Sequence, residues 1–178
     1  GTAYAVFDGH TANDGTTYVY KTADFGKTWQ SLAADNIEGF ARNIQEDFVN
    51  PDLLFLGTEF GLYVTINSGQ DWLHFTNNMP ATAVHYIALQ EKTNDLVMGT
   101  HGRGVIIIDD ISPLRELSAD VLDKKFHFFG GQITAVNNRG DGSCYIHVCY
   151  PYESVKKFRS RSCPQPVRIP PLLQHPHR

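Results

Sequence analysis

The sequence has no long hydrophobic run, few cysteines and no Asn-x-Ser/Thr glycosylation signal. Its longest purely aliphatic stretch is Val105–Ile108, which is far shorter than a membrane-spanning segment. The three cysteines are Cys144, Cys149 and Cys163, and their spacing around His147 is not that of a zinc finger. We therefore expect no membrane segment, no metal and no cofactor, while one disulfide beside a free thiol stays open.

Charge is unevenly distributed along the 178 residues. The formal net charge of −4 divides into −10 over residues 1–120, with 6 basic and 16 acidic side chains, and +6 over residues 121–178, with 9 and 3. Six of the nine prolines also follow residue 120. We therefore expect residues 1–120 to form the folded part and residues 121–178 to be a basic, weakly structured or non-native segment.

The basic side chains of this second segment could form a nucleic-acid patch. The relevant residues are Lys156, Lys157, Arg159, Arg161 and Arg168. Because no nucleic-acid-binding fold is recognisable around them, we expect a solvated tail and no nucleic-acid partner.

The acidic segment is an internal repeat. Residues 22–29, TADFGKTW, recur 43 positions later as residues 65–72, TINSGQDW. Residues 54–59, LFLGTE, recur 42 positions later as residues 96–101, LVMGTH. Several positions agree at nearly the same spacing, which indicates duplicated structural units of about 40 residues.

Each unit is expected to consist of short strands, because its β-branched and aromatic runs are bounded by Gly, Pro, Asn and Asp. The expected strands are 3–8, 16–22, 41–46, 53–58, 62–66, 72–76, 84–90, 95–100 and 105–109, followed by a short helix at 114–117. Further strands are possible at 126–129, 132–136 and 144–150. Four short strands per unit is typical of a β-propeller blade. The sequence thus predicts an all-β fold, a partial β-propeller of just under three four-stranded antiparallel blades with an irregular C-terminal tail.

The repeated turn has a mechanical interpretation. A turn Asp or Asn accepts hydrogen bonds from backbone N–H groups two or three residues on, and a Gly takes positive φ. The Trp that follows is expected to start the next strand and to be buried between sheets. We interpret these positions as structural and not catalytic: Thr22, Asp24, Gly26, Trp29, Asn67, Gly69, Trp72 and, in a third partial copy, Asp110.

Residues 22–29 match the Asp-box, or BNR repeat, at every defined position, and the second copy departs from it at Asn67 and Asp71. Residues 53–72 and 96–114 resemble the last blades of bacterial sortilin-like propeller proteins, relatives of sialidases and xyloglucanases. The resemblance covers residues 3–117. It implies large, often secreted proteins that bind peptides or glycans and in some branches cleave glycosides, and hence an extracellular or periplasmic location. No signal peptide is visible in the sequence.

Candidate binding residues follow from the alternation of connections in an antiparallel blade. The Asp-box turns occupy one face, so the other connections open on the opposite face, where binding usually resides. These connections carry Glu59, His101, Arg103 and His10. A carboxylate, imidazoles and a guanidinium suit a polar ligand, although solvated loop side chains are the alternative.

The sequence identifies no catalytic residue. We expect a non-catalytic propeller segment for glycan or peptide binding, or for scaffolding, within a larger protein. The alternative is a fragment of a glycoside hydrolase, sialidase- or xyloglucanase-like, with its catalytic residues largely outside this chain. Expected partners are a glycan or peptide ligand, and either the rest of a larger propeller or further copies of the chain that complete the ring.

Overall fold

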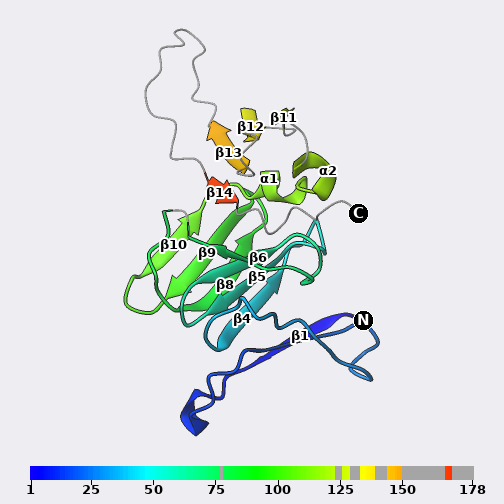
Figure 1. The fold of residues 1–178 in the computed structure, drawn as a ribbon, viewed down its shortest axis with the longest axis vertical. Coiled ribbons are helices and arrows are strands. Elements are labelled where there is room, and N and C mark those ends of the chain that lie inside the picture. Colours follow the sequence, from blue (N-terminus) through cyan, green and yellow to red (C-terminus); the bar gives the residue numbers. More distant parts are fainter. Residues whose placement is uncertain (77, 123–125, 129–132, 139–143, 150–166, 170–178) are drawn as a thin grey trace. The chain divides into compact units, whose positions relative to one another are not determined.

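The computed structural model describes residues 1–76, 78–122, 126–128, 133–138, 144–149 and 167–169 (Figure 1). The chain divides into two compact units, residues 1–115 and 116–178, each of which is described by itself. None of the helices in the described ranges is long and apolar enough to cross a membrane.

The first unit consists of three antiparallel sheets that follow one another in chain order (Figure 1). The first holds β1 (Ala3–Phe7), β2 (Tyr18–Thr22) and β3 (Gln30–Ser31), with a 3-10 turn, η1 (His10–Ala12), between β1 and β2. The second holds β4 (Ala41–Glu46), β5 (Leu54–Thr58), β6 (Leu62–Thr65) and β7 (Leu73–Phe75). The third holds β8 (Val84–Gln90), β9 (Asp95–Thr100) and β10 (Val105–Ile108), and α1 (Ser112–Arg115) follows it.

These sheets are blades of a partial β-propeller. The second is a complete blade of four strands, and each neighbour has three, so the prediction of just under three blades is confirmed. Every predicted strand up to residue 109 is present within two residues at each end. The expected helix at 114–117 lies at 112–115, and the two-residue β3, for which no range was predicted, follows Trp29 where the turn motif predicts the next strand.

The middle blade is buried on both faces. Leu54, Leu56 and Tyr63 pack with side chains of the first blade, while Phe55 and Leu62 pack with side chains of the third. β5 and β6 are therefore buried at every position, whereas β10 alternates between exposed and half-buried. The near-continuous hydrophobic sequence of β5, LFLGT, follows from this two-sided burial.

The second and third blades approach each other closely at Gly57 of β5. A Cβ atom added there would lie 2.6 Å from the backbone oxygen of Val84, which is shorter than any normal contact. Gly99, the equivalent residue of β9, has no such neighbour, since the nearest atom to its added Cβ is 3.6 Å away on Tyr86. The glycine is therefore required by packing in the second blade and not in the third.

A buried ion pair also joins the second and third blades. Arg115, at the end of α1, donates from Nε and Nη2 to the two carboxylate oxygens of Asp47, each at 2.9 Å. Its Nη1 donates to the side-chain oxygen of Asn94 at 2.6 Å. Asp47 is buried and also accepts hydrogen bonds from the N–H groups of Val49 and Asn50. Four N–H donors from three residues thus surround the Asp47 carboxylate, so its charge is compensated inside the protein.

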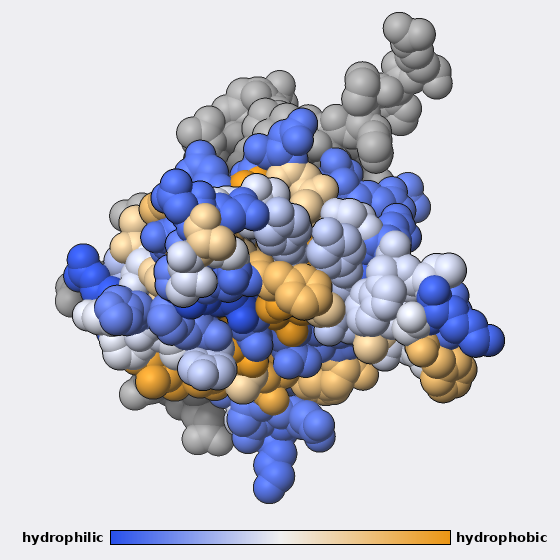
Figure 2. Space-filling view, turned by 90° about the horizontal axis from the view of Figure 1, so that it is seen from below, coloured by the Kyte–Doolittle hydropathy of each residue, from blue (hydrophilic) through white to orange (hydrophobic). Residues whose placement is uncertain are grey.

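The surface of the first unit has no single large apolar area in the view of Figure 2, where hydrophobic side chains stand as separate spots among hydrophilic ones. The large apolar side chains that are exposed are Phe7, Phe25, Trp29, Phe48, Val49, Phe60, Tyr86, Val105 and Ile107.

The second unit contains α2 (Ala119–Leu122) and a four-stranded antiparallel sheet. Its strands are β11 (Phe126–Phe128), β12 (Ile133–Asn138), β13 (Cys144–Cys149) and β14 (Val167–Ile169), in that order across the sheet. The first three were anticipated, but β14 falls in a segment whose proline content predicted no strand. Cys163 and the basic residues 156–161 lie outside the described residues.

Candidate functional site

The first turn motif, residues 22–29, is closed by its own side chains. The Oγ1 of Thr22 accepts a hydrogen bond from the Gly26 N–H at 3.0 Å and donates to Asp24 at 2.8 Å. The Asp24 carboxylate accepts from the N–H of Thr28 at 2.9 Å and from its hydroxyl at 2.7 Å. These bonds from Thr28, with the one from Thr22, lower the pKa of Asp24 to about 2. The carboxylate therefore reaches four residues on, further than the sequence predicted.

The second turn motif, residues 65–72, reproduces this network with one side-chain hydrogen bond reversed. Thr65 accepts from the Gly69 N–H at 3.1 Å, and the Asn67 oxygen accepts from the Asp71 N–H at 3.0 Å. The Asn67 amide then donates to the Asp71 carboxylate at 2.9 Å, where the first motif has a hydroxyl donating to Asp24. The two departures from the Asp-box pattern therefore compensate each other.

The third copy does not form this turn. Asp110 has a positive φ of 46°, and its side chain accepts a hydrogen bond from the Ser112 N–H at 3.1 Å, where α1 begins. In the two complete motifs, Gly26 and Gly69 have φ values of 85° and 87°, as a turn Gly requires.

The two motif tryptophans differ in environment. Trp72 is buried, and its Nε1 donates to the backbone oxygen of Leu32 in the preceding blade at 2.9 Å. Trp29 is 47% exposed, so the prediction that it is buried is wrong. A motif Trp packs on the blade before its own, and within the described residues no sheet precedes the first blade.

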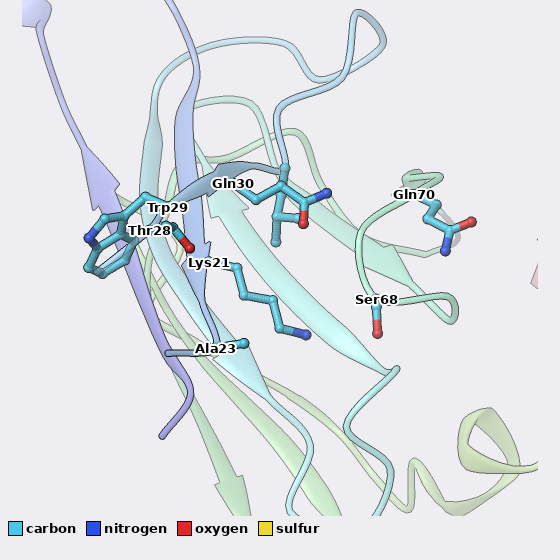
Figure 3. Close-up of a pocket in the computed structure, with 8 residues that line it drawn as sticks. Lys21, Ala23, Thr28, Trp29, Gln30, Ser68 and Gln70 are labelled. Carbon is cyan, nitrogen blue, oxygen red and sulfur yellow. The ribbon is translucent and has the colours of Figure 1, made fainter. Parts of the chain in front are cut away.

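A cavity of about 310 Å³ lies between the two turn motifs (Figure 3). Figure 3 shows Lys21 and Gln30 in the middle of the view, with Ser68 and Gln70 across from them on the right. The Trp29 ring lies to the left of Lys21 and Gln30. The full lining is Lys21, Ala23, Thr28, Trp29, Gln30, Leu32, Ser68 and Gln70. Lys21 is the one titratable group in this lining, so the cavity offers few groups for chemistry.

The opposite face, which we call the loop face, carries the connections β1–β2, β5–β6 and β9–β10. Ala3 of β1, Leu54 of β5 and Leu96 of β9 pair with residues 43 positions apart in the next strand, namely Thr22, Thr65 and Ile108. Counting five residues on from Ala3, Leu54 and Leu96 places one residue of each blade at the same point, just beyond the second strand. These equivalent residues are Asp8, Glu59 and His101.

A second equivalent position lies near the start of β4 and β8, the first strands of the second and third blades. In β4, the register with β5 shifts between Ala41 and Asn43, and in β8, the register with β9 shifts between Val84 and Tyr86. The extra residues at these two bulges are Arg42 and His85. Because a bulge redirects its extra side chain, both blades present a cationic or titratable group from the same place.

The Asp8 carboxylate contacts side chains from the first two blades, His10 and Arg42. Its carboxylate oxygens lie 2.6 Å from His10 Nδ1 and 2.7 Å from Arg42 Nη1. Phe40, which is buried, lies beneath both: its ring centroid is 5.2 Å from that of His10 and 4.5 Å from the Arg42 guanidinium carbon. The aromatic ring therefore orients the guanidinium and the imidazole that face the carboxylate.

Two imidazoles extend the site onto the third blade. The rings of His85 and His101 are stacked, with centroids 5.5 Å apart and planes inclined by 22°. The backbone of His101 is fixed by a hydrogen bond from its N–H to the Ala83 oxygen at 2.9 Å, just as the Glu59 N–H donates to the Phe40 oxygen at 3.3 Å. We call Asp8, His10, Phe40, Arg42, His85 and His101 the histidine–arginine cluster.

The electrostatics of the cluster follow from these contacts. Partial burial opposes ionisation of Asp8, but hydrogen bonds from His10 and the charge of Arg42 outweigh it and lower the pKa of the carboxyl group. The pKa of His85 is also lowered, first by burial and then by the charges of Arg42 and His101, while Asp8 partly offsets them. Asp8 is thus ionised at neutral pH, and His85 is neutral there.

The structure brings together two of the four predicted binding residues, His10 and His101. Glu59 occupies the position equivalent to His101, and Arg103 lies in the exposed β9–β10 connection between two glycines with positive φ. Prediction from the sequence missed four members: Asp8, Phe40, Arg42 and His85. The repeat spacing of 43 residues, extended into the inner strands, pairs Arg42 with His85 and could have identified them.

The described residues contain no group of three or more His, Cys, Asp or Glu side chains arranged to hold a metal ion. The cluster offers hydrogen bonds and charge through the Asp8 carboxylate, the Arg42 guanidinium and three imidazoles.

No protein-family model matches the sequence, and no curated protein matches it. Among solved structures, the chain is similar to one described as "YCF48 bound to D1 peptide", with 16% sequence identity and a TM-score of 0.35. The similarity covers 73% of this chain and 43% of that chain, so this chain spans less than half the length of that protein. The assignment of partial propeller blades rests on the strand order and register given above.

Proposed function

We propose that this chain is a non-catalytic segment of a larger Asp-box β-propeller protein and that it binds a glycan or peptide through the histidine–arginine cluster. The observation that carries this proposal is the convergence of polar side chains from all three blades at equivalent positions of the loop face. Asp8, Arg42 and His101 each come from a different blade. Rigid sheets thus hold the donors and acceptors of one site.

Membership of the Asp-box family is supported by the hydrogen-bond networks of the two turn motifs. In both, the Thr that opens the motif accepts from the Gly N–H, and the Asp or Asn accepts from the N–H four residues on. From the family resemblance we further propose an extracellular or periplasmic location, and additional blades or further copies of this chain as the partners that complete the ring.

Binding is favoured over glycoside hydrolysis by the state of the cluster's carboxylate. Hydrolysis in most glycosidase families needs a pair of carboxyl groups, one of them protonated when the reaction starts. Arg42 and His10 instead hold the pKa of Asp8 low, which suits a carboxylate that orients cations and not a proton donor.

The proposal is tested by screening the full chain against glycan and peptide arrays and measuring the best ligands by calorimetry. We expect binding that His101→Ala or Arg42→Gln weakens at least about tenfold, since each removes a polar contact worth about 1.4 kcal/mol or more. Lys92→Ala, an exposed cation on the β8–β9 turn, is the control and should bind normally. Binding that survives both cluster variants, or turnover of a bound glycan, contradicts the proposal.

A further inference from the structure

We propose that the histidine–arginine cluster recognises a carboxylate of its ligand, and that binding takes up protons on the His85–His101 pair, so that affinity rises as the medium becomes acidic. This inference rests on the proposed function and adds to it the chemical group that is bound and the control of binding by pH.

The first step of the argument is the charge of the cluster. At neutral pH, Arg42 and Asp8 compensate each other at 2.7 Å, and His85 is neutral because burial and the charge of Arg42 lower its pKa. Protonation of an imidazole adds one positive charge to the site. The cluster therefore becomes more cationic when its imidazole pair takes up a proton.

The second step is the geometry of the imidazole pair. With stacked rings 5.5 Å apart, protonated His85 and His101 repel each other. The groups that act on His85 come from three blades: Asp8 beside β1, Arg42 on β4 and His101 beside β9. Arg42 and His101 oppose its protonation and Asp8 alone favours it, so a second carboxylate brought by a ligand would reverse this balance.

The third step is the chain's own carboxylate. Asp8 already lies between two nitrogen groups of this surface, with His10 Nδ1 at 2.6 Å and Arg42 Nη1 at 2.7 Å. The arrangement shows that a carboxylate fits between a guanidinium and an imidazole here. His85 and His101 offer imidazole donors of the same kind on the third blade. The carboxylate within the cluster, that of Asp8, lies on the first blade.

Thermodynamic linkage then fixes the direction of the effect. If an anion favours the protonated pair, protons must favour anion binding by the same factor. Uptake of one proton with each anion makes the affinity rise about tenfold for each unit by which the pH falls, within the range where the pair is neutral without ligand.

The experiment uses the full chain and small probes followed by NMR, with the ring protons of His85 and His101 as reporters. The probes are glucuronate and N-acetyl-aspartate amide, which carry a carboxylate on a sugar and on a peptide unit. The methyl ester of glucuronate is the uncharged control. Titrations are run at about pH 7.5 and about pH 5.5, on either side of the ordinary imidazole pKa.

We expect the carboxylate probes to bind at least about tenfold more tightly at the lower pH, and the ester to bind no more tightly at either pH. His85→Gln with His101→Gln should remove the pH dependence, whereas His74→Gln, an imidazole outside the cluster that is stacked on Tyr63, should keep it. A preference for one carboxylate probe identifies the glycan or the peptide as the source of the group.

Any of three results overturns the inference. These are equal affinity at the two pH values, equal binding of acid and ester, and unchanged ring-proton signals of His85 and His101 when a probe is added at the lower pH. These outcomes leave the proposed function standing if an array ligand binds at neutral pH and loses affinity with Arg42→Gln. Conversely, acid-dependent binding of the probes without any array ligand would contradict the proposed function alone.

Discussion

The indole Nε1 of Trp72 donates a hydrogen bond to the backbone oxygen of Leu32, forty residues earlier, and this bond fastens the second turn motif to the preceding blade. Gly69 reinforces the contact, because a Cβ added there would lie 3.1 Å from Leu32 Cδ1. The turn motif is therefore a joint between blades as well as a link between two strands of one blade.

Replacing each motif tryptophan by Ala should show this difference. Trp72→Ala removes a buried ring and its hydrogen bond, so we expect the free energy of unfolding to fall by about 3–5 kcal/mol. Trp29→Ala removes a half-exposed ring and should cost less than about 1 kcal/mol. Urea unfolding of both variants measures the contrast, and equal losses would mean that Trp29 is buried in solution.

The two equivalent glycines of β5 and β9 provide a matched pair of substitutions. Gly57→Ala forces its new methyl group against the Val84 oxygen, and we expect a loss of about 1–3 kcal/mol from the shift this requires. Gly99→Ala meets no close atom and should change stability by less than about 1 kcal/mol. Thermal unfolding measures the stability of both variants. If Gly57→Ala did not lower stability, the second and third blades would approach each other less closely than described.

The ion pair of Arg115 and Asp47 should be costly to break from one side. Arg115→Gln leaves a buried carboxylate without its two guanidinium donors, so a loss of about 3–5 kcal/mol is expected. Adding Asp47→Asn to this variant should restore part of that loss, because the uncompensated charge is then gone. A double-mutant cycle by chemical denaturation measures the coupling, and strictly additive effects would show that the pair contributes no coupling energy.

Asp24 should make the first turn motif sensitive to acid. The unfolded carboxyl group titrates near its ordinary pKa of 3.8, whereas the folded one has a pKa of about 2. Between these values the unfolded chain binds a proton that the folded chain does not, so stability falls as the pH is lowered through this window. Carbon NMR of the side-chain carboxyl group should show titration near pH 2, and titration near 3.8 would contradict the network described here. Asp24→Asn is the control and should lack this part of the acid dependence.

The strands of the blades were predictable because local patterns determine them. Alternating or continuous apolar runs bounded by turn residues gave β4, β8 and β9 with their observed bounds. The burial of a side chain was less predictable, because it depends on which element lies next to it. Trp29 and Trp72 follow turns with similar backbone geometry, and among the described strands only the second has a preceding blade to pack against.

The candidate site was predictable only in part, for a similar reason. His10 and His101 stand in connections, where polar residues are expected to face solvent. Arg42 and His85 lie within strands, and strict alternation places them on a face of the sheet. The register shifts at both residues come from pairing with the neighbouring strand, which no local sequence pattern reveals.

The bulge positions and the residues beyond the second strands have a consequence for how such a protein can change over time. Copying a blade also copies two surface positions whose side chains stand outside the hydrophobic layers. The blades present Arg42 and His85 at one position, and Asp8, Glu59 and His101 at the other, on scaffolds that share their antiparallel strand order. Substitutions at these positions can therefore change the chemistry of the loop face one blade at a time, at little expense to folding, and duplicated blades become a set of independently adjustable surface positions.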